Sequence, residues 1–373
     1  MAARWPSAIL GALGCTAVFG LGVMAHGRLA GVTAALLLMA NPVYRMHARR
    51  AMCDVPTEAL VLMTAAAAIC SWRRMLRGPC SFARWVAAAG LVGLLAGLAA
   101  LAKLNGLLSL MIVAALAGLA LALRLRTPRR GSGAVAGAAL LSAWVGALTF
   151  VILNPFATAD PSPPLAGETA RLAASGLAGR LIALVEHRRR LSRQMQVWFP
   201  RDALPSLDAK IHAILTRGFG RYGALGPSAV ATAAGAGPSV DRRAWVWGPW
   251  VLAGAAGATL WGRRQVREGE PPTAWAVLLA AAVAFATIAA YLPMAWDRYF
   301  LPIQSWSALL AGCAAAEAAP RLVLALRAAT VGLRRRPAMF AAACYVLLMI
   351  ALADILRPAP LAEPPEVFVS DLP

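Results

Sequence analysis

The chain alternates long apolar stretches with short polar connections that are rich in arginine. A helix needs about 20 apolar residues to cross a hydrocarbon core of roughly 30 Å, and most of the stretches approach that length. The pattern predicts about ten membrane-spanning helices, the second of them short. These predicted spans are residues 9–25, 29–40, 57–72, 84–101, 104–123, 134–153, 245–261, 274–292, 303–319 and 338–356. We therefore expect an all-α polytopic membrane protein.

The spacing of the predicted spans divides the chain into three parts. Residues 1–153 hold six spans, residues 154–243 are polar and proline-rich, and residues 244–373 hold four spans and a tail. In the middle part, apolar residues recur at helical spacing over 172–185 and a basic cluster begins at His187. This stripe predicts an amphipathic helix in the membrane interface. A helix packed on the outer face of the protein, with its arginines in water, is the other interpretation.

Composition supports the membrane assignment, because 60% of the residues are hydrophobic and only 14% are charged. The net charge of +20 would suit a nucleic-acid partner, but its distribution argues against one. Short connections that all lie on one predicted side carry the arginine clusters: 73–84, 124–130, 263–267 and 334–336. The positive-inside rule makes that side cytoplasmic and places both termini and residues 154–243 outside. Six cysteines, mostly within spans, predict no disulfide framework.

Candidate chemistry gathers in the outer connection formed by residues 41–58. It brings together His47, Arg49, Arg50, Asp54 and Glu58. Guanidinium groups bind phosphate in a fork, and a carboxylate can orient a sugar hydroxyl or a metal ion. The alternative is a solvated loop that neutralises its own charges.

Three further outer connections carry charged residues. Lys103 lies in a tight turn, where it offers a point charge for a phosphate or extends to the membrane interface as an anchor. Asp160 follows the sixth span, and Arg298 follows the eighth, beside Asp297 with which it could pair. Because these connections meet on one face, we expect an outward-facing pocket for a charged ligand. No CxxC or HExxH motif supports a dedicated metal site.

Several segments, taken in order, resemble the GT-C membrane glycosyltransferases. They are RWPSAILGAL at 4–13, GRLAGVTAALLLMANPVY at 27–44, HARRAMCDVPTEAL at 47–60, GLLAGLAALAKLNGLLSL at 93–110, ILNPFATADP at 152–161 and RYFLPIQSWSALLAG at 298–312. The chain is most similar to the branch of protein O-mannosyltransferases and lipid A aminoarabinose transferases. The resemblance implies transfer of a sugar from a polyprenyl-phosphate carrier to a glycan, lipid or protein acceptor, on the outer side of the bacterial inner membrane.

The resemblance also assigns roles. Asp54 matches the second acid of the family's site, Lys103 matches a lysine near the carrier phosphate, and Arg298 is a further phosphate contact. It implies no certain cofactor, although a divalent metal is compatible with the chemistry. Family members have an additional first helix and an outer loop with the principal acid, and this chain starts after that loop. We therefore expect carrier binding with little sugar transfer, unless Glu58 or Asp160 substitutes. A multi-pass transporter and a non-catalytic membrane scaffold are the alternatives.

Overall fold

The computed structural model describes residues 4–49, 52–78, 80–126, 132–154, 176–200, 202–217 and 242–329. Apart from a single bridge between Ala203 and Met294, the regular elements of this part are helices. They are α1 (Trp5–His26), α2 (Arg28–Ala40), α3 (Pro42–Ala48), α4 (Asp54–Arg77), α5 (Phe82–Ala102), η2 (Leu104–Leu107), α6 (Leu108–Arg126), α7 (Ser132–Leu153), α10 (Leu177–Trp198), α11 (Leu207–Arg217), α12 (Arg242–Arg267), α13 (Thr273–Tyr291) and α14 (Asp297–Ala329). The predicted all-α class is confirmed.

Six segments in the described part are long and apolar enough to cross a membrane. They are Trp5–His26, Asp54–Arg77, Phe82–Ala102, Leu104–Leu123, Gly133–Leu153 and Thr273–Tyr291. Each of the first nine predicted spans coincides with a helix, and α2 is short, as expected. Helices α12 and α14 are not among the six, and tryptophan, glycine and an internal proline interrupt α12. The predicted span at 338–356 lies outside the described residues.

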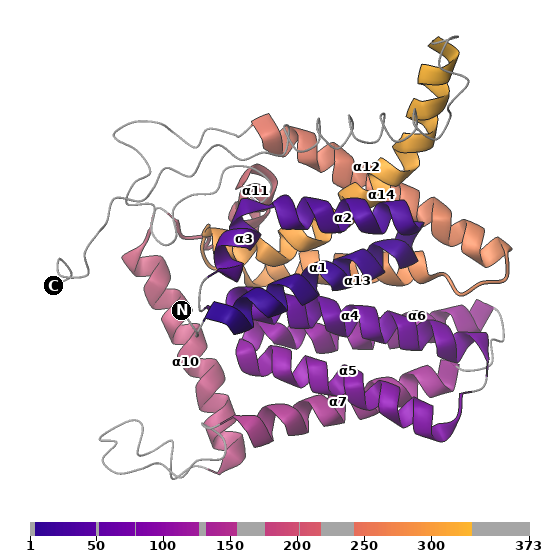
Figure 1. Cartoon of the computed structure of the whole chain (residues 1–373). Helices are drawn as coiled ribbons and strands as arrows, with labels where there is room; N and C mark the ends of the chain where they lie inside the picture. Colours follow the sequence, from indigo (N-terminus) through magenta and orange to yellow (C-terminus); the bar gives the residue numbers. More distant parts are fainter. Residues whose placement is uncertain are drawn as a thin grey trace.

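The long helices lie side by side in one bundle (Figure 1). Helices α13 and α14 pack directly against α1 and α4, so the first and last parts of the chain share one apolar core. Helices α5 and α7 approach each other closely at Gly93 and Gly97, where an added Cβ would lie 2.6 Å from a backbone oxygen of α7. The end of α14 turns away from the bundle (Figure 1), and this helix contains Pro320, which removes a helical hydrogen bond.

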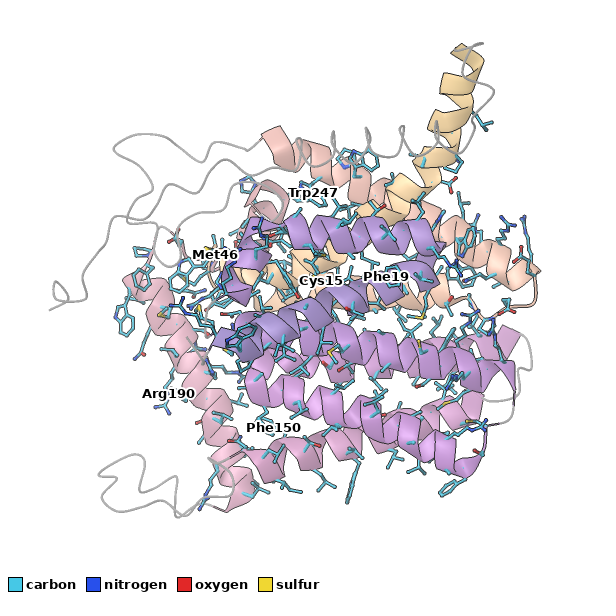
Figure 2. The ribbon with its side chains drawn as sticks, in the orientation of Figure 1. Cys15, Phe19, Met46, Phe150, Arg190 and Trp247 are labelled. Carbon is cyan, nitrogen blue, oxygen red and sulfur yellow. The ribbon has the colours of Figure 1, made fainter. Side chains whose placement is uncertain are left out.

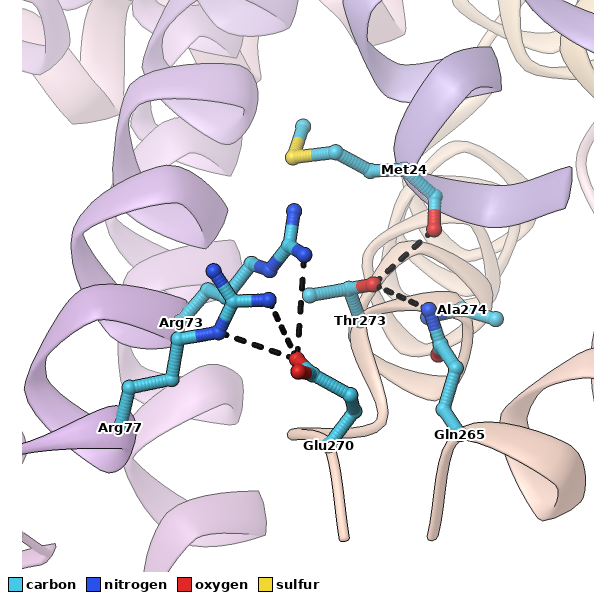
Figure 3. Close-up of polar contacts among 7 residues, drawn as sticks. All are labelled: Met24, Arg73, Arg77, Gln265, Glu270, Thr273 and Ala274. Atoms are coloured by element: carbon cyan, nitrogen blue, oxygen red, sulfur yellow. Dashed lines mark hydrogen bonds and ion pairs between the residues drawn. The ribbon is translucent and has the colours of Figure 1, made fainter. Parts of the chain in front are cut away.

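One end of the bundle carries the arginines at the end of α4 and the connection between α12 and α13, which the sequence places on a single side. Figure 3 shows Arg73 and Arg77 of α4 converging on Glu270 between α12 and α13. Beside them the Thr273 hydroxyl donates to the Met24 carbonyl at 3.0 Å, which ties this connection to the end of α1. These contacts place the end of α4, the α12–α13 connection and the end of α1 together. Residues 127–131 and 334–336 lie outside the described residues, and that this end faces the cytoplasm stays a prediction.

The opposite end carries α3, the start of α4, η2 and the start of α14. Helix α10 lies crosswise over this end, transverse to the long helices (Figure 1). Figure 2 shows Met46 of α3 and Arg190 of α10 at this same end. The predicted amphipathic helix is therefore present, and its orientation suits either a membrane interface or a cover over the bundle.

Candidate functional site

A cavity of about 770 Å³ opens beneath α10, at the end of the bundle opposite the basic connections. The start of α4, the Lys103 turn, the end of α13 and the first turns of α14 form its other walls. A second cavity of about 530 Å³ shares Asp54, Lys103 and Arg298 with the first and adjoins it. We call the two together the outer cavity.

Two carboxylates enter the outer cavity from the first turns of α4. Asp54 is the first residue of that helix and Glu58 follows one turn later, so that both side chains lie on one face. The N-terminal end of the helix dipole favours a negative charge at Asp54. Both residues are buried, and Glu58 Oε1 has no hydrogen-bond partner among the described residues. Glu58 thus keeps a buried acceptor atom without a partner in the wall of the cavity.

Lys103 reaches the outer cavity because the chain breaks between α5 and η2. Its backbone is extended, with φ −163° and ψ 141°, and its carbonyl accepts a hydrogen bond of 2.7 Å from the Gly106 N–H. A Cβ on Gly106 would lie 2.1 Å from the backbone of Ala99, so this turn requires glycine. The Lys103 ammonium donates to Asp54 Oδ1 at 2.5 Å. The pair joins two segments that are 49 residues apart in the sequence.

Arg298 lies in the first turn of α14 against aromatic rings. Its guanidinium carbon is 4.7 Å from the Trp296 ring centroid and 5.2 Å from that of Tyr299. Trp296 is itself held by a hydrogen bond of 3.2 Å from its indole N–H to the Asp202 carboxylate. Cation–π contacts orient the guanidinium without using its N–H donors, and Nε has no hydrogen-bond partner among the described residues.

Helix α10 contributes a wall of arginines. Residues Val185, Arg188, Arg189, Ser192, Arg193 and Gln196 all line the outer cavity. Their spacing of three and four residues places them on one helical face. The end of this helix is anchored where Gln196 donates to the Pro293 carbonyl at 3.1 Å. The segment after α10 pairs with the α13–α14 connection, since the Leu204 N–H also donates to the Pro293 carbonyl, at 3.0 Å.

The lining of the larger cavity combines charged and apolar side chains. Six cationic side chains face two carboxylates, and the cations are Lys103, Arg188, Arg189, Arg193, Lys210 and Arg298. Apolar side chains line the remainder, among them Val61, Leu108, Met111, Ile288 and Leu301. A concave site with this mixed lining fits a ligand that has an anionic group and an apolar part.

The structure brings together only part of the predicted site. Asp54, Glu58, Lys103 and Arg298 all line the outer cavity. Two other candidates do not line it: His47 is buried within α3, and Arg49 is exposed at the end of that helix. Arg50 and Asp160 lie outside the described residues.

The arginines of α10, together with Lys210 and Tyr299, were not among the predicted site residues. The amphipathic stripe with its basic cluster was the available signal for the arginines, because a helix with one cationic face must direct that face toward something.

The described residues hold no ready-made cluster of metal ligands. They contain no group of three or more His, Cys, Asp or Glu side chains arranged to hold an ion. The outer cavity offers two carboxylates, but the Lys103 ammonium already occupies Asp54 Oδ1. A bound ammonium repels a second cation from the same oxygen atoms, so we assign no step to a metal.

No family model and no curated protein matches this sequence. Solved structures do match. The oligosaccharyltransferase of Archaeoglobus fulgidus in its apo form has a TM-score of 0.53 and 19% identity, over 94% of this chain and 43% of that one. The oligosaccharyltransferase AglB of the same organism, in complex with an inhibitory peptide and a dolichol-phosphate, has a TM-score of 0.55 and 18% identity over the same shares.

At these identities the likeness shows the fold alone. The chain spans less than half the length of the matched oligosaccharyltransferases. The GT-C resemblance of the sequence motifs, and the O-mannosyltransferase and aminoarabinose transferase branch within it, stay predictions.

Proposed function

We propose that the protein is a membrane glycosyltransferase that takes a sugar from a polyprenyl-phosphate carrier and transfers it to an acceptor on the outer side of the bacterial inner membrane. The observation that carries this proposal is the outer cavity, where buried carboxylates, several cations and an apolar wall meet at one end of a membrane bundle. The fold likeness to oligosaccharyltransferases adds support.

The apolar wall suits the first units of a prenyl chain. Leu107 and Met111 line the cavity and are also partly exposed on the bundle surface. A prenyl chain that runs from the cavity to this surface leaves the apolar wall of the cavity and enters the hydrocarbon of the bilayer. Cations line the same cavity, so that the phosphate of the carrier can meet Arg298 and the Lys103–Asp54 pair.

The carboxylates supply the base that transfer requires. In the proposed step, Glu58 accepts the proton of the acceptor hydroxyl as its oxygen bonds to the anomeric carbon. The bond between that carbon and the carrier phosphate breaks at the same time. The phosphate leaves with the electron pair, stabilised by Arg298 and Lys103. Asp54, held by the Lys103 ammonium, positions that cation.

A binding measurement and a sugar-transfer assay test separate parts of this proposal. Arg298→Gln should weaken binding of a prenyl-phosphate-linked sugar roughly tenfold or more, because a hydrogen bond to a charged group is worth about 1.5–3 kcal/mol. Glu58→Gln should retain binding and reduce transfer by a factor of about 10²–10⁴. Arg49→Gln is the matched control, since Arg49 is exposed at the same end but does not line the outer cavity.

A failure of the wild-type chain to bind a prenyl-phosphate-linked sugar would remove the proposed donor. Binding that Arg298→Gln and Arg49→Gln weaken equally would place the phosphate elsewhere. Transfer that persists in Glu58→Gln would exclude Glu58 as the base.

A further inference from the structure

Positive charge in the outer cavity exceeds what its own acids compensate. The two lysines in its lining already have partners. Lys103 is bound to Asp54, and the Lys210 ammonium donates to the Ala290 carbonyl at 2.6 Å. The excess therefore resides in the arginines.

Four arginines line the cavity without a carboxylate within ion-pair distance among the described residues: Arg188, Arg189, Arg193 and Arg298. At physiological ionic strength charges interact over about 8 Å, so neighbouring guanidinium groups on one helical face repel each other. A bound anion relieves this repulsion, and it does so in proportion to its charge.

The arginines also occupy separate positions. Arg188 and Arg189 lie on one turn of α10, and Arg193 lies on the next, about 6 Å beyond Arg189 along the axis. Arg298 comes from a different wall, on α14. Each guanidinium can grip a phosphate in a two-bond fork. A single phosphodiester carries one negative charge and cannot serve all of these groups, whereas a diphosphate diester carries two charges on adjacent phosphorus centres.

We infer that the outer cavity selects a lipid carrier whose headgroup is a diphosphate over one whose headgroup is a monophosphate, with Arg188 and Arg193 of α10 as the residues that discriminate. The inference rests on the proposed function and names the charge class of its donor. The second phosphate lies under α10, and the first lies between Arg298 and Lys103.

The test uses the full chain in phosphatidylcholine nanodiscs, with a chelator present so that no divalent metal contributes. Affinities are measured for farnesyl diphosphate, farnesyl monophosphate, inorganic pyrophosphate and farnesol. We expect farnesyl diphosphate to bind about tenfold more tightly than the monophosphate, and farnesol to bind least. The double variant Arg188→Gln/Arg193→Gln should lose this discrimination while it keeps its affinity for the monophosphate. Arg190→Gln, on the same helix but outside the cavity lining, should keep the discrimination.

The outcomes separate this inference from the proposed function. If neither farnesyl diphosphate nor farnesyl monophosphate binds, both the inference and the proposed function are overturned. Equal affinities for the two prenyl phosphates overturn the inference and leave the proposed function standing. Inorganic pyrophosphate that binds as tightly as farnesyl diphosphate would show that the site reads the anion without its lipid. Competition by phosphatidylglycerol at equal mole fraction would show that α10 reads anionic lipids in general. Either of these two results contradicts the selection of a diphosphate carrier.

Discussion

The Lys103–Asp54 pair yields the most quantitative prediction, because its two members differ in exposure. The Asp54 side chain is 4% exposed and that of Lys103 is 17% exposed. Lys103→Ala leaves the Asp54 carboxylate charged, without its ion-pair partner, at a place that little water reaches. Removal of one partner from a buried pair costs about 3–5 kcal/mol, and the helix N-terminus returns up to about 1 kcal/mol to the stranded charge. We therefore expect a loss of about 2–4 kcal/mol in the free energy of unfolding.

Substitution of Asp54 should lower the free energy of unfolding less than substitution of Lys103. Asp54→Asn keeps an oxygen that accepts a hydrogen bond from the ammonium, and Lys103 borders an open cavity that water can enter. A loss of about 1–2 kcal/mol is expected, since only the charge assistance of the hydrogen bond disappears. The double variant Lys103→Ala/Asp54→Asn buries no uncompensated charge, so its loss should be smaller than the sum of the two single losses by about 1–3 kcal/mol.

Thermal melting of all three variants in detergent micelles, without ligand, measures these differences in stability. Lys210→Ala serves as the control, because Lys210 is the only other lysine and bonds to a backbone carbonyl in place of a carboxylate. The reasoning is refuted if Lys103→Ala melts no lower than Lys210→Ala, or if the losses of the two single variants simply add.

Three further predictions concern other parts of the molecule. A membrane-impermeant maleimide applied to intact cells should label Cys53 and spare Cys80, since both are exposed and lie at opposite ends of α4; the reverse pattern would invert the orientation. Gly254→Ala should destabilise the protein by at least about 1–3 kcal/mol in thermal melting, because the new Cβ would lie 1.8 Å from a backbone oxygen of α14. Gly20→Ala, with no atom within 4 Å of its new Cβ, should not destabilise it, and equal losses would contradict the packing of α12 on α14. A guanidinium of α4 holds the pKa of Glu270 below its ordinary value of 4.5, so the pair stabilises the fold above pH 4.5 and loses this effect as pH falls through the lowered pKa. Glu270→Gln should therefore lower the melting temperature slightly at pH 7 and leave it unchanged in strong acid; a difference that persists in acid would exclude the charge as its cause.

Local pattern determined the helices of this protein. Apolar runs of sufficient length must satisfy their backbone groups internally in a bilayer, and therefore they become helices at the predicted places. The same logic placed Asp54, Lys103 and Arg298 at helix ends on one side. Each lies at the end of a predicted span, and successive spans cross the membrane in alternate directions. Their meeting at one cavity was thus within reach of the sequence.

Tertiary packing decided which neighbouring charges belong to the site. His47 and Asp54 are close in sequence, yet the former is buried in α3 and only the latter lines the cavity. Arg188 and Arg193 are far from both in sequence, and they line the cavity because α10 crosses the end of the bundle and is anchored at Pro293. Hydropathy and helical period describe which face of a helix is apolar, but they carry no information on what the opposite face will meet. That depends on contacts between segments distant in the chain, which only the folded structure establishes.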